Sequence, residues 1–597
     1  MGNRLRWIVL GISAVPVLGA GPGCGGNGSG AVPDGFGSTG GSMARSAEPG
    51  SPGSSGGMTG GITGSSAPAS GGMAGPGLGM SGGAVNAGSG SGGATPGATG
   101  GAGAAGAPSG GGSGGKTSNG GSTGTAGSPG PVDGGTDGGG TSPVSTGGDT
   151  GALGPGSCPA DPNLPKEPVD PPACTTLMAS KSTPDEATLD TSRIQAALDA
   201  CGPGKAVRLT RSGANDTFVT GKLTIKGTYL WVDAGTTLYA SRNPSSYGCS
   251  AGVDAEKNSC GAVITVSGDG AGIVGSGTID GQGGEPVMGQ TQSWWDISVA
   301  LRDSNGSASN PALIAVSGAS NFVMHDIHVY NSPKFHVKLS SAGFMVWGVT
   351  VLTPSKVTSS AGKALSPYGA RNTDGIDPGG SSGATKGYIV CSKISVGDDQ
   401  IAIKGSSGAV ANLTITHNHF GTGHGMSIGS ETNSGVSQVA VYDLTIDGTI
   451  PTGGSPASDV NGIRIKSDAS RGGLVDGVTY TDVCMRSLAN PILLDPTYSS
   501  TSGSLIPQFK NIAFKDIHAT GGGTVTLDGF DSSHLSTVTL DNVVIDGSPT
   551  VHATNATIGL GPGAVSFPAP TGAGVTVTGT SGVSTPVDCG ARWVTFP

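Results

Sequence analysis

Three side chains suited to acid–base chemistry recur at equal intervals in the middle of the chain. Asp374, Asp399 and His424 are spaced 25 and 25 residues apart, and Asp398 adds a second carboxylate directly before Asp399. Carboxylates held close together raise one another's pKa, which suits proton transfer near neutral or mildly acidic pH. If the chain repeats with the same period, these side chains lie on one face of neighbouring repeats.

Two cations follow in the segment Arg464-Ile465-Lys466. Side chains alternate across a strand, so both cations are predicted to share one face while Ile465 points inward. Arg464 comes 40 residues after His424, and the loop at 448–461 can absorb the excess over one repeat. The groups together predict a groove that can move protons and bind an anion.

Each of these motifs also has a structural interpretation. Asp374 and Asp377 suit a turn or a structural calcium site. The Asp398–Asp399 pair suits a solvated loop, and the two cations suit a solvated sheet edge. Trp294-Trp295 lies in a loop sequence and either stacks on sugar rings or packs against the core.

The elements that must position these residues repeat along the chain. Similar strand-turn-strand segments begin at Gly387, Asn412 and Gln438, which are 25 and 26 residues apart. Short β-branched strands at a fixed period predict an all-β fold, a right-handed parallel β-helix of the pectin-lyase-like kind. The helical pattern at 190–200 is expected to cap its open end. A sandwich or barrel is the competing architecture, but Asn-Gly hairpin signals are scarce.

The composition divides the 597 residues into three parts. Residues 1–24 resemble a secretion signal, with Arg4 and Arg6 before an apolar stretch. Residues 25–157 are dominated by Gly, Ser, Ala and Thr and are expected to be a disordered linker, because they cannot bury enough apolar surface. Residues 158–597 are expected to form the catalytic β-helix domain.

The same features predict where the protein acts. Cys24 follows the apolar stretch and is a candidate lipid anchor, so the protein is expected to be secreted or tethered to the outer cell surface as a lipoprotein. The net charge of −10 excludes a basic nucleic-acid surface, and no internal run reaches the length of a membrane span.

Eight cysteines lie between Cys158 and Cys589, an even number that suits an oxidising compartment. Two pairs have spacings that suit local disulfides: Cys174 with Cys201, and Cys249 with Cys260. Cys391 and Cys484 lie in strand patterns and are interpreted as buried thiols.

Four motifs in a fixed order resemble a known family. They are Asn372-Thr-Asp-Gly-Ile-Asp, Gly397-Asp-Asp-Gln, Gly423-His-Gly and Arg464-Ile-Lys, and they resemble the motifs of the polygalacturonases, glycoside hydrolase family 28. The resemblance runs from about Cys174 to near the C-terminus and is strongest to bacterial endopolygalacturonases. One departure is Gln400, where many fungal members carry Cys.

The resemblance implies hydrolysis of the α-1,4-galacturonosyl bonds of polygalacturonate or pectin by an inverting mechanism that uses two carboxylates. It implies that Asp398 is the general acid, that Asp374 and Asp399 activate water, and that His424 controls the proton of the acid. It implies no metal and no cofactor, and a monomer is expected.

The resemblance also implies a set of substrate-binding residues: Arg464, Lys466, Asn372 and Tyr498. Galacturonate carries a carboxylate on every sugar, and the two cations suit charge-assisted hydrogen bonds to it. Three alternatives remain open: an exo-acting or related pectic hydrolase, a calcium pectate lyase, and a non-catalytic surface β-helix that binds carbohydrate.

Overall fold

The computed structural model describes residues 158–249, 260–303, 308–381, 386–449, 460–499, 501–583 and 585–596. The predicted signal at 1–24 and the predicted linker at 25–157, with Cys24, lie outside the described residues, so both stay predictions. Within these ranges no helix is long and apolar enough to cross a membrane.

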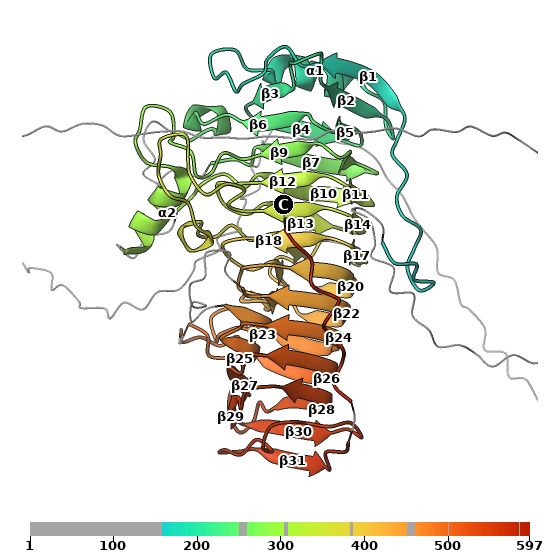
Figure 1. Cartoon of the computed structure of the whole chain (residues 1–597), viewed down its shortest axis with the longest axis vertical. Helices are drawn as coiled ribbons and strands as arrows, with labels where there is room; N and C mark the ends of the chain where they lie inside the picture. Colours follow the sequence, from blue (N-terminus) through green and yellow to red (C-terminus); the bar gives the residue numbers. More distant parts are fainter. Residues whose placement is uncertain are drawn as a thin grey trace, which may run out of the picture. The chain divides into compact units, whose positions relative to one another are not determined.

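The described residues form a parallel β-helix, as the repeat predicted (Figure 1). One sheet of this part of the chain has 11 strands, each paired in parallel with the next. These strands are β4 Leu223–Lys226, β7 Ile264–Asp269, β10 Ile314–Ser320, β13 Val337–Ser341, β16 Ile376–Gly379, β19 Ile401–Ile403, β21 Met426–Ile428, β23 Asn461–Lys466, β25 Asn490–Asp495, β27 Thr524–Asp528 and β29 Thr550–Thr554.

The second sheet has 20 strands within the described ranges. Its shorter strands are β1 Ala173–Met178, β2 Ala206–Thr210, β3 Thr217–Thr220, β5 Tyr229–Val232, β6 Thr237–Ala240, β8 Gly272–Val274, β9 Thr278–Asp280, β11 Phe322–His325, β12 His328–Tyr330, β14 Phe344–Trp347, β15 Thr350–Leu352, β17 Gly387–Val390, β18 Lys393–Ser395, β30 Ala556–Leu560 and β31 Thr576–Gly579. Its long strands are β20 Val410–Phe420, β22 Val436–Asp447, β24 Leu474–Arg486, β26 Gln508–Thr520 and β28 Ser536–Ile545.

The long strands bend at aligned positions. His417 in β20, Asp443 in β22 and Asp482 in β24 have φ values of 55°, 48° and 56°. The residues before them are paired across the sheet, so the three bends stack on one another. Asp is one of the residues that tolerate this left-handed conformation best, which explains why polar side chains interrupt otherwise β-branched strands.

Aliphatic side chains from successive rungs stack inside the β-helix. Ile376 of β16 pairs with Ile401 of β19, which pairs with Met426 of β21. Met426 in turn pairs with Ile463 of β23, and all four side chains are fully buried. Burial of this continuous core is the main force that holds the rungs in register.

The N-terminal end is capped by helix α1 Thr191–Ala200, as predicted. Ile194 and Leu198 are buried on its inner face and pack against the first rungs. The other helical segments of the described residues are α2 Trp294–Asp303 and the 3-10 turns Pro244–Tyr247 and Pro367–Gly369. Trp294 and Trp295 begin α2 and are 1% and 3% exposed, so they pack against the core rather than present a sugar-stacking face.

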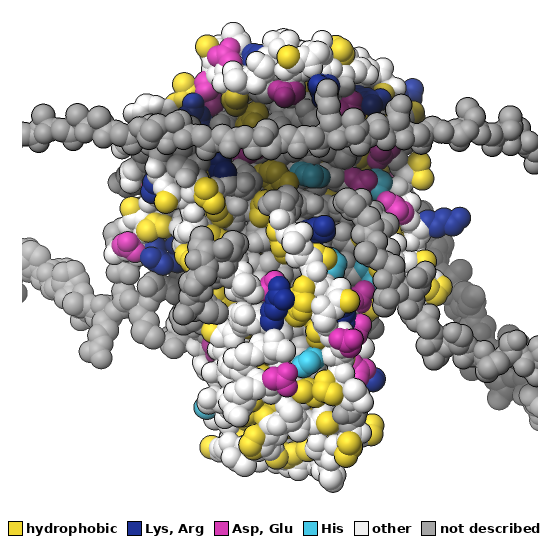
Figure 2. Space-filling model, in the orientation of Figure 1, with side chains coloured by type: hydrophobic (Ala, Val, Ile, Leu, Met, Phe, Trp, Pro, Cys, Tyr) yellow, Lys and Arg dark blue, Asp and Glu magenta, His cyan; other side chains and the backbone are white. Residues whose placement is uncertain are grey.

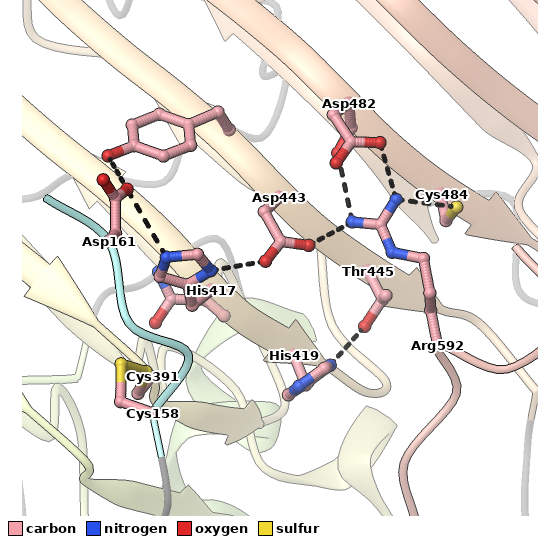
Figure 3. A network of polar contacts seen from close by, with 12 residues as sticks. Cys158, Asp161, Cys391, His417, His419, Asp443, Thr445, Asp482, Cys484 and Arg592 are labelled. Carbon is pink, nitrogen blue, oxygen red and sulfur yellow. Dashed lines mark hydrogen bonds and ion pairs between the residues drawn. A yellow bond between two sulfur atoms is a disulfide. The ribbon is translucent and has the colours of Figure 1, made fainter. Parts of the chain in front are cut away.

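Disulfides fasten the two ends of the described chain to the middle of the β-helix. Figure 3 shows the bond of the N-terminal end, Cys158–Cys391. The predicted local pairs, Cys174–Cys201 and Cys249–Cys260, are both present. The interpretation of two strand cysteines as buried thiols was wrong, because Cys391 is bonded to Cys158 and Cys484 to Cys589. These partners are 233 and 105 residues apart, so no local spacing could indicate them.

Ion pairs reinforce both attachments at the aligned bends. Asp161 of the N-terminal segment accepts a hydrogen bond of 2.8 Å from Tyr442. Arg592 of the C-terminal segment contacts Asp443 and donates to Asp482 at 2.7 Å. His417 lies between the two groups and hydrogen-bonds to Asp443 (Figure 3). The polar residues that bend the strands therefore also bind the chain ends.

Candidate active site

The repeat places the acid–base residues as predicted from their spacing. Asp374, Asp399 and His424 each stand two residues before a strand of the 11-stranded sheet, namely β16, β19 and β21. These strands are paired in register, so the three residues lie on successive rungs. Backbone hydrogen bonds continue the ladder into the turns, since the Gly375 amide donates to the Asp399 carbonyl at 2.9 Å.

Asp398 and His424 form a hydrogen-bonded pair. The distance from His424 Nδ1 to Asp398 Oδ1 is 2.9 Å. The backbone amides of Asn372 and Asp399 donate to the same carboxylate, at 3.2 and 3.0 Å. Burial disfavours the charged form of Asp398, but the charge and hydrogen bond of His424, with nearby Lys466, outweigh it and hold the pKa of Asp398 far below its usual value.

Asp399 is bound by groups from the next two rungs. Lys466 Nζ donates to Asp399 Oδ2 at 2.8 Å, and Ser427 Oγ donates to Oδ1 at 2.7 Å. Arg464 is 3.6 Å from Oδ1. Burial acts to raise the pKa of Asp399, but the two cations dominate and keep it below its usual value. Asp399 is therefore held as a carboxylate.

Asp374 and Asp377 have the opposite electrostatic character. Burial and neighbouring carboxylates, above all Asp377 and Asp398, raise the pKa of Asp374 well above its usual value. Burial also raises the pKa of Asp377, to about 7, although Lys404 opposes this. No described residue donates a hydrogen bond to Oδ1 of either side chain. The four carboxylates thus divide into a pair that stays ionised and a pair with high proton affinity.

The predicted substrate-binding residues lie beside these carboxylates. Arg464 and Lys466 share one face of β23 while Ile465 is buried in the core, as the alternation predicted. Their cationic groups lie 5.0 and 5.2 Å from the ring centre of Tyr498, which is 37% exposed. Both cations are largely buried, and both are paired with the carboxylate of Asp399. A role in substrate binding stays a prediction for all four residues, Asn372 included.

Gln400 stabilises the turn that presents His424. Its side-chain amide donates to the Gly421 carbonyl at 2.7 Å, and its side-chain oxygen accepts from the Gly425 amide at 2.6 Å. The departure from the fungal pattern at this position thus has a local function, because one side chain holds both sides of the His424 turn.

The donor atoms of Asp398, Asp399 and His424 lie within 4.8 Å of one another, a spacing that a metal ion can use. Lys466 and Arg464 of β23 already neutralise Asp399 from two rungs away. A divalent cation would be repelled by these charges, so we do not assign the group as a metal site.

Three comparisons with known proteins agree with this geometry. Residues 216–561 match the profile of Glycosyl hydrolases family 28. The chain belongs to this family. A polygalacturonase of Ralstonia solanacearum is 39% identical over 498 residues, which cover 73% of this chain and 92% of the relative. An endo-polygalacturonase of Pectobacterium carotovorum subsp. carotovorum is 40% identical over 411 residues, which cover 67% of this chain and 93% of the relative.

A solved structure supports the same assignment. The polygalacturonase from Erwinia carotovora ssp. carotovora is similar with 39% sequence identity and a TM-score of 0.59, covering 67% of this chain and 100% of that one. The family that the four motifs indicated is confirmed, and the protein is a glycoside hydrolase.

Sequence reasoning missed two charged residues of the site. Lys404 Nζ is 3.7 Å from Asp374 Oδ2 and 3.8 Å from Glu431 Oε2. A signal was available, because Lys404 directly follows β19 and forms a bridge to Gly379, the last residue of β16. Counting the 25-residue period from Gly379 leads to Lys404 and would have placed it in the row of site residues.

Proposed function

We propose that this protein is an inverting endo-polygalacturonase that cleaves α-1,4-galacturonosyl bonds in polygalacturonate and so degrades plant cell wall pectin. The observation that carries the proposal is that the neighbouring carboxylates Asp398 and Asp399 have different partners. Asp398 is hydrogen-bonded to His424, which can supply it with a proton, whereas Asp399 is paired with the permanent cations Lys466 and Arg464. An inverting hydrolase needs such a difference, with one group to deliver a proton and another to activate water.

The proton of the leaving group belongs to the Asp398–His424 pair. A carboxyl with a lowered pKa donates strongly but is seldom protonated by itself, so His424 Nδ1, 2.9 Å from Oδ1, is the reservoir that supplies it. Delivery to the glycosidic oxygen breaks the bond and leaves Asp398 as a carboxylate. His424 acts through Asp398 and controls when the acid is ready.

Water activation falls to Asp374 and Asp399. A general base must accept a proton, and burial and neighbouring carboxylates raise the proton affinity of Asp374. Asp399 stays ionised and stabilises the positive charge that develops on the sugar ring. The product leaves with inverted anomeric configuration because water attacks from the face opposite the leaving group.

Substrate recognition is assigned to the cations and the aromatic ring beside the carboxylates. Tyr498 is partly exposed over Arg464 and Lys466, so a galacturonate residue that contacts the ring also approaches both cations. Asn372 lies two residues before Asp374, and its backbone amide donates to Asp398 at 3.2 Å, so we assign its side chain to the same sugar.

The test is hydrolysis of polygalacturonate followed by NMR of the first product formed. We expect the β-anomer at the new reducing end, oligomers of mixed length early in the reaction, and full activity in the presence of EDTA. Retained configuration would refute the two-carboxylate inverting mechanism. Monomers alone would refute endo action, and unsaturated products lost with EDTA would indicate a calcium lyase.

We also propose that the protein is exported and works at the outer cell surface or beyond it. Four disulfides support an oxidising compartment. On the face drawn in Figure 2, acidic and basic side chains of the described residues are intermixed. Radiolabelled palmitate incorporated by the wild type but not by Cys24→Ser would establish the lipid anchor, and its absence from both would refute it.

A further inference from the structure

Lys404 occupies a central place among the charges of the site. It follows β19 directly, and its backbone amide donates to the Pro378 carbonyl at 2.8 Å. Its ammonium group lies 3.7 Å from Asp374 and 3.8 Å from Glu431, and its side chain is 18% exposed. The backbone bond fixes the start of the side chain, and the two carboxylates fix its end.

Glu431 is itself held by a chain of alternating charges. Arg471 lies 3.5 Å from Glu431, and Arg471 Nε donates to Asp468 Oδ2 at 2.8 Å. Ser470 and Ser499 hydrogen-bond to Asp468 in turn. Glu431 therefore keeps its negative charge and its position, and this arrangement draws the ammonium of Lys404 to the edge of the catalytic cluster.

Few other cations among the described residues act on the carboxylate of Asp374. Asp377, Asp398 and Asp399 all face it and favour its protonated form. The two cations of β23, described above, are committed to Asp399. The amine of Lys334 donates to the Ala308 carbonyl and interacts with Asp374 only through space. His336 Nδ1 donates to the backbone carbonyl of Asp374, not to its carboxylate.

We propose that Lys404 is a positioning residue that keeps Asp374 in the carboxylate form needed to accept the proton of the attacking water. The inference rests on the role of Asp374 given under the proposed function. Glu431 opposes Lys404 in this role, because its negative charge offsets part of the field that Lys404 exerts on Asp374. The two residues together set the pH at which the base becomes active.

The test is the pH dependence of kcat/KM on polygalacturonate for Lys404→Gln, Lys404→Arg and Glu431→Gln. The acid limb is the fall of kcat/KM at low pH, where the base becomes protonated. An opposite charge within about 4–6 Å shifts a carboxyl pKa by about 1–3 units, so Lys404→Gln should move the midpoint of this limb to higher pH by at least about one pH unit. Lys404→Arg should restore the wild-type limb, and Glu431→Gln should move it down. Lys515→Gln, which removes an exposed lysine far along the chain, is the matched control and should leave the profile unchanged.

The competing role for Lys404 is direct binding of a galacturonate carboxylate. That role predicts a rise in KM at every pH with an unmoved acid limb, and this result would overturn the proposal. The proposal predicts opposite shifts of the acid limb for Lys404→Gln and Glu431→Gln, because they remove charges of opposite sign. An upward shift in both variants would indicate a general loss of packing and would also overturn the proposal.

Infrared titration gives a readout that does not depend on activity. In protein labelled with carboxyl-¹³C aspartate, the band lost in Asp374→Asn reports the ionisation of Asp374, and Lys404→Gln should shift its midpoint upward. If the wild type does not cleave polygalacturonate, the proposed function fails, but the infrared shift still decides whether Lys404 controls Asp374. An unshifted midpoint would refute the proposal.

Discussion

Replacement of Lys466 by Met should destabilise the protein, because it leaves a buried carboxylate without its main partner. Lys466 and Asp399 are 2.8 Å apart, and their side chains are 7% and 1% exposed. Removing one partner of such a buried pair costs about 3–5 kcal/mol. Ser427 and Arg464 still contact Asp399 at 2.7 and 3.6 Å. We therefore expect a loss at the lower end, about 3 kcal/mol, in the free energy of unfolding at pH 7.

The pH dependence of this loss has a defined sign. The lowered pKa of Asp399 means that the pair stabilises the native state above the unfolded pKa, about 4, and that this contribution is lost as the pH falls through the folded value. In Lys466→Met the Asp399 carboxyl can take up a proton at a higher pH than in the wild type. The protonated form is neutral, so it avoids the destabilisation caused by an unpaired buried charge. The difference in free energy of unfolding between wild type and Lys466→Met should therefore be largest near neutral pH and smaller at acid pH.

Urea unfolding followed by circular dichroism at pH 7 and at about pH 4 measures both effects. Lys466→Met/Asp399→Asn should recover much of the lost stability, because it removes the unpaired charge. Lys515→Met is the matched control, since Lys515 is 54% exposed. It should change stability by less than about 0.5 kcal/mol. Wild-type stability of Lys466→Met at pH 7, with only a raised KM, would refute this reasoning and leave recognition of the substrate carboxylate as the sole role of Lys466.

Three further predictions follow from the site and the chain ends. Asp398→Asn should lower kcat by about two to four decades, measured as release of reducing ends; activity near wild type would contradict its role as the acid. Cys589→Ser should cost about 2–5 kcal/mol in urea unfolding, because it opens a disulfide that spans 105 residues, and an unchanged midpoint would show that the C-terminal segment adds no stability. Burial lowers the pKa of His336 to about 4, so wild-type stability should decline as the pH falls from about 6.5 to 4, while the unfolded chain takes up the proton first. His336→Gln should flatten this decline in urea titrations, and an equal slope in both proteins would contradict the assignment to His336.

The row of acid–base residues could be predicted from the sequence because a β-helix converts chain spacing into spatial order. Asp374, Asp399 and His424 are 25 residues apart, and their rungs are paired without a register shift. The alternation of Arg464 and Lys466 about Ile465 was predictable for the same reason, since side chains in a strand alternate between faces. Both predictions depend only on periodicity, which the sequence records directly.

The pairing of charges could not be predicted in the same way. Period alone places Lys466 near a groove, but it does not distinguish a cation that faces the substrate from one that binds Asp399. The distant disulfides of Cys391 and Cys484 were missed for a related reason, because their partners lie on chain ends that return to the middle rungs. The chain ends lie outside the repeat, so their contacts cannot be predicted from the 25-residue period.

The reach of side chains explains why particular residue types stand at the positions around Asp399. Neighbouring rungs are about 4.8 Å apart, so a residue two rungs away is separated by about 9.6 Å along the β-helix axis. Ser427, on the next rung, needs only a short side chain to donate to Asp399. Arg464 and Lys466 stand one rung further, on β23, and only long cationic side chains span that separation. Histidine at either position would be too short to reach Asp399, and the carboxylate would then depend on a single cation and Ser427 for its charge.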